Sequence, residues 1–183
     1  MRLSTAAILL ALFLAAAGGG VEAQTANDTL TTHLDLSRRR LRAVPPEVYT
    51  MTNLRHLNLS HNRLDSLDER LLLLTRLDTL LLGRNRLRHV PEWIGNMRSL
   101  RLLDMSRNPI LDLPPSMANL TRLERLVLWS TGVVSVPQEM GALNYTLKEL
   151  DLRVCPMTYD DQKAVEEILP TPRKRWDHVC NCK

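Results

Sequence analysis

Apolar residues recur along this chain at a fixed step of 23 residues. Six units can be aligned, and the first, fourth and sixth positions are apolar in almost every unit. In the second unit these positions are Leu54, Leu57 and Leu59. The units begin at Thr31, Leu54, Leu77, Leu100, Leu123 and Leu147, and the fifth has one extra residue. A repeat of this length predicts a stacked solenoid, because no unit can bury its apolar set alone.

Within each unit the pattern predicts a short strand, a turn and a return segment. Positions 4 and 6 are two residues apart, so on an extended chain both point to one face while positions 3, 5 and 7 point to the other. Position 15 is proline in four units, where it ends extended structure: Pro45, Pro91, Pro114 and Pro137. We therefore expect six parallel strands in a sheet roughly 25–30 Å wide.

The pattern L-x-x-L-x-L-x-x-N-x-L-x-x-L-P over residues 31–169 resembles the leucine-rich repeat. The resemblance implies an α/β solenoid with a concave parallel sheet and an irregular or short-helical convex side. It also implies that the asparagines at position 9 turn inward and bridge backbone groups of neighbouring units: Asn62, Asn85 and Asn108. Arg39, Thr131 and Cys155 depart from this pattern, although cysteine is the usual substitute in the family.

The N-terminal segment has the features of a signal peptide. A basic residue, Arg2, precedes a short apolar run, and small residues lead to Ala23. We predict that residues 1–23 are the signal peptide and that residues 24–30 form a short segment without a cysteine cap. The apolar run is too short and too rich in Ala and Gly for a membrane span. The mature chain, about one domain in length, is expected to be secreted, extracellular and not membrane-spanning.

The repeats in residues 31–169 are predicted to end in a closing helix. Thr158 or Asp160 can serve as its N-cap, acidic residues occupy the first turn, and Pro170 stops it. Its inner stripe is expected to contain Ala164, Val165, Ile168 and Leu169. Residues 170–183 are expected to form a cysteine-containing tail.

All three cysteines lie in the C-terminal region: Cys155, Cys180 and Cys182. In a secreted protein a disulfide is the first expectation, and a bond from Cys155 to Cys180 or Cys182 would hold the tail over the last repeat. A bond within Cys180-Asn-Cys182 is disfavoured because so short a ring strains the geometry. The third thiol is then free or bonded to another chain. A zinc site that adds His178 is a second interpretation, although the spacing matches no standard pattern.

Four sequons agree with a glycoprotein of the secretory route: Asn27, Asn58, Asn119 and Asn144. Some of them can remain without a glycan. Asn58 lies on the predicted concave face, where a glycan would cover the N-terminal half. Either that sequon is unused or a partner binds over units three to six.

The concave face carries the first candidate binding surface. Apolar residues and arginines gather around one tryptophan on a face that should contact water, as in the centre of a protein interface. The candidate partner-binding residues are Leu81, Arg84, Leu102, Arg107, Arg125, Val127 and Trp129. The alternative is that these are the isolated apolar residues common on any surface.

A second candidate surface is an edge of arginines at positions 8, 10 and 12 of the first three units. Arginine outnumbers lysine strongly in this chain, and its forked guanidinium suits carboxylate, sulfate or phosphate. The residues of this basic edge are Arg38, Arg40, Arg42, Arg63, Arg86 and Arg88. They can hold an acidic glycan or acidic partner. The alternative is a solvated edge whose charge Asp65, Asp68 and Glu69 offset.

Together these features favour a binding module over an enzyme. The five histidines form no metal spacing, and no nucleophile motif or phosphate loop appears. We expect no catalytic residue, metal, cofactor or nucleic-acid partner. The predicted function is recognition of another extracellular or cell-surface protein through the concave face, by a monomer or a disulfide-linked dimer. Two alternatives stay open: a matrix component that binds acidic glycans or is disulfide-linked to a partner, and an accessory subunit or inhibitor of a cell-surface receptor.

Overall fold

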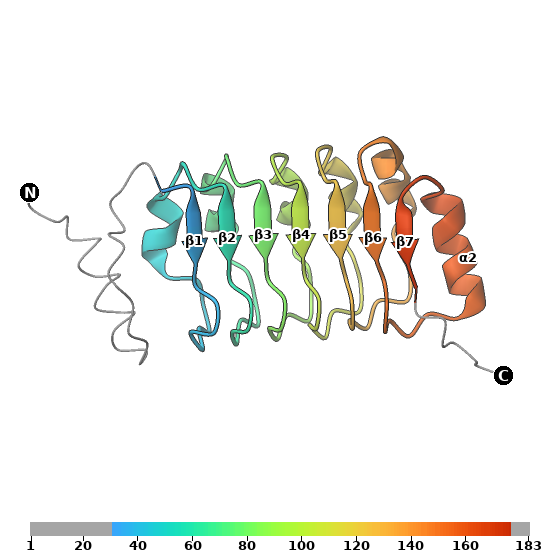
Figure 1. Ribbon diagram of the computed structural model, residues 1–183, viewed down its shortest axis with the longest axis horizontal. Helices are drawn as coiled ribbons and strands as arrows, with labels where there is room; N and C mark the ends of the chain where they lie inside the picture. Colours follow the sequence, from blue (N-terminus) through green and yellow to red (C-terminus); the bar gives the residue numbers. More distant parts are fainter. Residues whose placement is uncertain (1–30, 177–183) are drawn as a thin grey trace, which may run out of the picture.

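The computed structural model describes residues 31–176 and shows a solenoid built on one open parallel sheet (Figure 1). The seven strands stand in chain order, and each pairs in parallel with the next. Their bounds are β1 His33–Asp35, β2 His56–Asn58, β3 Thr79–Leu81, β4 Leu102–Asp104, β5 Arg125–Val127, β6 Glu149–Asp151 and β7 Arg173–Arg175. Equivalent positions of successive units lie opposite each other, so Leu57 faces Leu34 on one side and Leu80 on the other.

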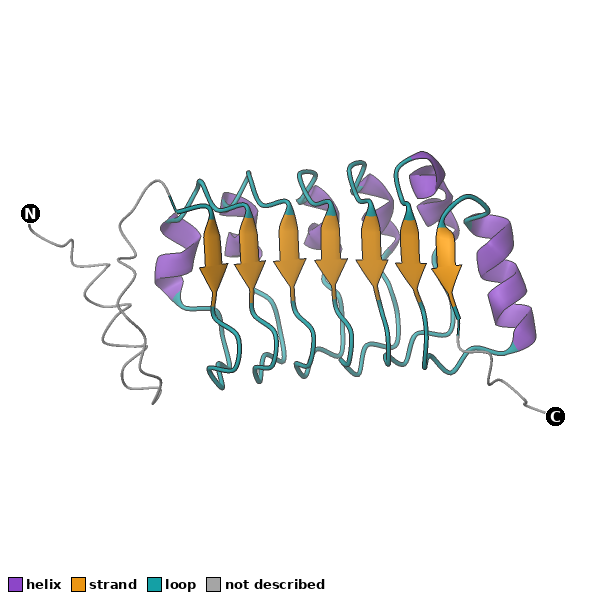
Figure 2. Cartoon of the chain, viewed as in Figure 1, coloured by secondary structure: helices purple, strands orange, loops and turns teal. Residues whose placement is uncertain are grey.

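The return segments are 3-10 helices that lie behind the sheet on its convex side (Figure 2). They are η1 Pro46–Thr50, η2 Glu69–Leu73, η3 Glu92–Asn96, η4 Pro115–Asn119 and η5 Gln138–Tyr145. Four of them follow the proline at position 15, whose φ lies between −74° and −57°. The fixed φ of proline suits the start of a helical turn. The expected return after position 15 is confirmed.

The apolar positions form one core between the sheet and the 3-10 helices. Leu57, Leu80 and Leu103, at position 4 of successive units, are completely buried. The helical segments pack closely on the convex side, since a Cβ added at Gly95 of η3 would lie 2.1 Å from the carbonyl oxygen of Ser116 in η4. The stacked arrangement predicted from the 23-residue step is confirmed.

A ladder of asparagine side chains runs through the core at the turns that follow β2, β3 and β4. Nδ2 of Asn85 donates to the carbonyl oxygen of Leu82 in its own unit at 2.8 Å and of Leu59 in the previous unit at 3.0 Å. Its Oδ1 accepts from the backbone N–H of Leu64 at 3.1 Å. Two further residues at position 9 make the same contacts: Asn62 and Asn108. The predicted bridging role is confirmed.

The ladder changes in the last two units. Thr131 donates only to the carbonyl oxygen of Leu128 in its own unit, at 2.8 Å, and contacts Sγ of Cys155 at 3.4 Å. Sγ of Cys155 lies 3.3 Å from the same Leu128 oxygen, which is the position-6 carbonyl of the previous unit. Cys155 therefore occupies the ladder position and reproduces the contact of an asparagine with the previous unit, as the resemblance implies.

A left-handed backbone conformation recurs at position 8, immediately before the ladder residue. Six non-glycine residues there have φ between 51° and 58°: Arg38, His61, Arg84, Arg107, Ser130 and Val154. This conformation is unfavourable for residues that carry a Cβ, most of all for a β-branched one. Its presence in every one of these units indicates that the turn which carries position 9 into the core requires it.

The predicted closing helix is α2, Tyr159–Ile168, and it covers the C-terminal end of the stack (Figure 1). Thr158 is its N-cap, since Thr158 accepts from the backbone N–H of Asp161 and the Asp161 carboxylate accepts from the Thr158 N–H in return. Its inner stripe is narrower than expected. Val165 and Leu169 are buried, whereas Ala164 is exposed and Ile168 is half-buried.

The sheet has seven strands where the sequence predicted six. Residues Arg173–Arg175, expected within the C-terminal tail, pair with β6 as strand β7. The strand was not predicted because Lys174 stands at the position that holds leucine in the other strands, with charged residues on both sides.

The amine of Lys174 is partly buried in this strand. Its Nζ lies 3.3 Å from the carbonyl oxygen of Pro172, and the partial burial lowers the pKa of the amine.

Some predictions concern residues outside the described range. The signal peptide in residues 1–23, the segment 24–30 and the end of the tail, with His178, Cys180 and Cys182, all lie there. Within residues 31–176, none of the helices has the length and apolar character needed to cross a membrane.

Replacing Asn85 by alanine tests the ladder. The substitution leaves the N–H of Leu64 and the carbonyl oxygen of Leu82 without this buried partner, so the free energy of unfolding should fall by about 2–4 kcal/mol in urea titration. Asn96→Ala, an exposed asparagine in η3, is the control and should change stability by less than about 0.5 kcal/mol. An equal fall in the free energy of unfolding of the two variants would show that the ladder does not contribute to stability.

Candidate binding surfaces

The concave face presents columns of side chains from positions 3, 5 and 7, each one unit apart. The 3-10 helices all lie on the opposite face, and nothing in the described part of the chain covers this one (Figure 2). The position-3 column changes along the stack from His33 and His56 to Arg125, Glu149 and Arg173. The repeat therefore fixes the spacing of the columns, while the residue types in them vary.

Trp129, at position 7 after β5, stacks against arginines. The guanidinium carbon of Arg107 lies 4.0 Å from the ring centroid, and that of Arg153 lies 5.9 Å away. Trp129 is half-buried. Arginine over a tryptophan face is a favourable cation–π arrangement, and it holds the ring in a defined orientation. The structure thus brings together Trp129 and Arg107, two of the predicted partner-binding residues.

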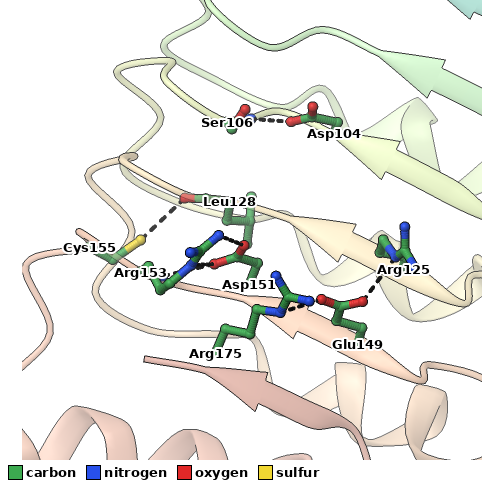
Figure 3. Close-up of polar contacts among 9 residues, drawn as sticks. All are labelled: Asp104, Ser106, Arg125, Leu128, Glu149, Asp151, Arg153, Cys155 and Arg175. Atoms are coloured by element: carbon green, nitrogen blue, oxygen red, sulfur yellow. Dashed lines mark hydrogen bonds and ion pairs between the residues drawn. The ribbon is translucent and has the colours of Figure 1, made fainter. Parts of the chain in front are cut away.

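The predicted apolar residues surround a carboxylate. Asp104 of β4 lies opposite Leu81 on one side and Val127 on the other, and Leu102 precedes it by two residues on the same face. The Asp104 carboxylate accepts from the backbone N–H of Ser106 at 2.8 Å (Figure 3). All three apolar residues are half-buried. The surface therefore alternates apolar and acidic groups.

Ion pairs join the last three strands. Glu149 forms ion pairs with Nε of Arg125 at 3.0 Å and with Nε of Arg175 at 2.6 Å, which links β5, β6 and β7 (Figure 3). Beside them, Arg153 forms a fork with Asp151 at 2.9 Å and 2.7 Å. Arg125 was a predicted partner-binding residue, and the structure places it within this network.

The C-terminal part of the concave face carries more positive than negative charge. At positions 3, 5 and 7, four arginines stand beside three carboxylates, Asp104, Glu149 and Asp151, and these arginines are Arg125, Arg153, Arg173 and Arg175. Arg107 at position 8 adds a fifth positive charge, and at position 2 the cations Arg101 and Lys148 outnumber Glu124. The sequence did not indicate Arg173 and Arg175, because no repeat was predicted there. Three consecutive basic residues, 173–175, were the only sequence signal for this part of the surface.

The N-terminal part of the concave face has a different chemistry. The rings of His33 and His56 stack with centroids 5.5 Å apart. Partial burial opposes ionisation of Asp35, but hydrogen bonds from Ser37 and Asn58 outweigh it and lower the pKa of this carboxyl group. Polar groups here are thus bonded to one another.

The predicted basic edge lies on the loops that follow β1 to β3, and all six of its arginines are exposed. Arg84, predicted for the concave face, is exposed on the left-handed turn after β3 and adjoins this edge. The acids expected to offset its charge do not pair with it. Asp68 instead forms an ion pair with Arg70, whose Nη2 lies 2.6 Å from Oδ2 of Asp68. The hydrogen bonds from Arg70 lower the pKa of Asp68 to about 2.

The described sequons stand in three environments. Asn58 is half-buried on the concave face and accepts from the Ser60 N–H. Asn119 is exposed at the end of η4. Nδ2 of Asn144 donates to the carbonyl oxygen of Ile168 at 3.0 Å and so ties η5 to the end of α2. Glycosylation at these sites remains a prediction, and Asn27 lies outside the described residues.

Comparison with known proteins supports the repeat. A sequence profile described as "Leucine rich repeat" matches residues 29–87, and a second with that description matches residues 99–120. No curated protein sequence matches the chain. Among solved structures, a leucine-rich repeat protein of Leptospira interrogans is 26% identical with a TM-score of 0.76, over 80% of this chain and 37% of that one.

Two plant receptors have a similar fold. The peptide hormone receptor RGFR1, solved in complex with RGF2, is 24% identical with a TM-score of 0.59, over 74% of this chain and 22% of that one. The leucine-rich repeat ectodomain of the receptor kinase GASSHO1/SCHENGEN3 from Arabidopsis thaliana, solved in complex with Casparian strip integrity factor 2, is 23% identical with a TM-score of 0.63, over 81% and 18%. The chain thus spans at most 37% of the length of any of the three.

Replacing Glu149 by glutamine tests the ion-pair network. The substitution leaves Arg125 and Arg175 facing each other without their shared carboxylate, so the free energy of unfolding should fall by about 1 kcal/mol at low salt. The loss should shrink in 1 M salt because screening weakens both the pairs and the repulsion. Glu139→Gln, on an exposed residue of η5, is the control. A loss that does not depend on salt would contradict the electrostatic role.

Proposed function

This chain is a leucine-rich repeat protein, and we propose that it is a secreted module that binds another protein through the concave face of strands β3 to β7. The observation that carries the proposal is the half-buried Trp129 held under Arg107 on an uncovered sheet. Tryptophan and arginine are the residues most often responsible for binding energy at protein interfaces.

The solved plant receptors support a protein partner at the level of the fold. RGFR1 and GASSHO1/SCHENGEN3 are both in complexes with named factors, RGF2 and Casparian strip integrity factor 2. Their identity to this chain is low, so they say nothing about which residues it would use. The role of each residue comes from its place on the concave face.

Each predicted residue has a distinct role in this proposal. Trp129 is the anchor, since its position is already fixed and a partner side chain can pack on its open part without ordering the ring first. Leu81, Leu102 and Val127 supply the apolar area on which a partner packs, at the strands next to the anchor. Arg84, on the turn beside β3, contributes at the rim.

The arginines define the chemistry of the partner. Glu149 pairs with Nε of Arg125 and with Nε of Arg175, so the terminal nitrogens of both guanidinium groups can donate to further acceptors. Arginine forks bind carboxylates in two-point contacts. The preferred partner segment therefore has an apolar or aromatic side chain beside one or more carboxylates.

Replacing Trp129 by alanine should abolish this recognition. A random peptide library displayed on phage is selected on the wild-type chain, and the affinities of the enriched peptides are measured by calorimetry. Loss of an interface tryptophan costs about 2 kcal/mol or more, so Trp129→Ala should weaken these peptides at least about 30-fold. Enriched sequences should combine apolar residues with Asp or Glu.

Tyr145→Ala provides the matched control, because this tyrosine is 97% exposed and lies in η5 on the convex side. It should leave peptide affinity unchanged. If Trp129→Ala binds the enriched peptides within about threefold of the wild type, the proposed binding surface is wrong.

Secretion is tested by expressing the full chain in a eukaryotic host with its own N-terminus. If residues 1–23 are a signal peptide, the protein collects in the medium and mass spectrometry finds Gln24 as its first residue. A chain that begins at residue 24 should stay inside the cell. Recovery of the full chain from the cytoplasm with Met1 in place would overturn this part of the proposal.

A further inference from the structure

The loops that follow β1, β2 and β3 carry a second charged surface, apart from the proposed concave site. Its centre is a row of one arginine per unit at position 10: Arg40, Arg63 and Arg86. Positions 8 and 12 add Arg38 and Arg84 on one side and Arg42 and Arg88 on the other. All seven side chains are exposed. The row runs along the stack, with units about 5 Å apart at the sheet.

The asparagine ladder fixes the backbone beneath this row. Arg40 stands between the N–H groups of Arg39 and Leu41, and Oδ1 of Asn62 accepts both at 3.0 Å. The N–H of Arg63 donates to the carbonyl oxygen of Leu41 at 2.8 Å, and the N–H of Arg86 donates to that of Leu64 at the same distance. The row is therefore held in place by the core, and only the side chains need to be ordered on binding.

These seven arginines form no ion pair within residues 31–176, and the one acidic residue in their columns is the exposed Asp65, at position 12 between Arg42 and Arg88. None of them has a carboxylate oxygen within 4.0 Å, whereas Arg55, Arg101, Arg125, Arg153 and Arg175 on the concave side all do. A row of unpaired guanidinium groups is costly to the isolated protein through mutual repulsion. An external anion relieves that repulsion and supplies the acceptors that the forks lack.

The surroundings of the row indicate which anion fits. The large hydrophobic residues that are exposed on loops of this kind, Leu111, Val134 and Val154, belong to later units. The row has no tryptophan, tyrosine or phenylalanine on which nucleic-acid bases could stack, its only neighbouring rings being His61 and His89, and no large apolar residue to insert into a membrane or a protein partner. The surface is therefore a periodic row of arginine guanidinium groups. Such a row matches a linear polymer with repeating anionic groups.

We propose that a sulfated polysaccharide binds along this edge, across the loops of the first three units, with Arg40, Arg63 and Arg86 as its main contacts. Sulfate groups accept two-point hydrogen bonds from guanidinium as phosphate and carboxylate do. The three main contacts lie outside the concave face, and Arg84 is the one residue shared with the site proposed there, so this site does not depend on the function proposed for that face.

The test measures affinity for a heparin oligosaccharide with purified wild-type protein and a triple variant, Arg40→Gln, Arg63→Gln and Arg86→Gln. The variant should bind at least about tenfold more weakly, and its affinity should fall less steeply with salt because fewer ion contacts form. Chemically desulfated oligosaccharide should not bind the wild type.

The control variant removes the same charge elsewhere: Arg76→Gln, Arg98→Gln and Arg122→Gln, all exposed on the turns that precede the strands. It should keep wild-type affinity, and equal weakening in both variants would overturn the assigned edge. Single-stranded DNA or phosphatidylserine vesicles that bind through the same arginines as tightly as heparin would overturn the polysaccharide assignment. Should the first variant misfold, Arg38→Gln, Arg42→Gln and Arg88→Gln serve the same test.

Discussion

The fold depends on one constraint: each strand must turn back toward the convex side without leaving its buried peptide groups unpaired. The asparagine at position 9 meets this need by joining two carbonyl oxygens of adjacent units and an N–H of the previous unit. An amide side chain has both donors and an acceptor, so it can serve groups of both kinds. The residue before it adopts the unfavourable left-handed conformation, with a φ of 56° at Arg84, so this turn contains local backbone strain.

The same constraint determines where function can reside. The apolar core positions hold leucine in most units, and position 9 holds asparagine in the three central ones, so these positions differ little along the stack. The exposed positions are placed by the core yet free to vary. On the concave face they change from polar groups around His33 to the Trp129 and arginine surface of the later strands. On the loops they change from arginines in the first units to Leu111 and Val134.

Much of this arrangement was predictable from the sequence, because the period of the apolar residues indicates which positions of each unit are buried. The leucine positions and the capped helix after Thr158 follow from residue type and spacing, whereas the inward asparagines and the ladder role of Cys155 follow from the resemblance to the leucine-rich repeat. The seventh strand does not, since Lys174 replaces the expected leucine and pairing with β6 is a tertiary effect. The placement of Asp104 among the apolar residues and the pairing of Glu149 with two arginines depend on register and side-chain geometry, which the order of residues does not report.

The ladder makes the loops after the strands rigid, so that the side chains on these loops lie in fixed rows. Native-state hydrogen exchange at the amides of Leu41, Leu64 and Leu87, which all donate to ladder asparagines, tests it most directly. If the ladder holds the loops, these amides should exchange only through global unfolding, with a free energy equal to that of the strand amides. Exchange at the rate of an exposed loop would contradict this structural basis for both binding surfaces.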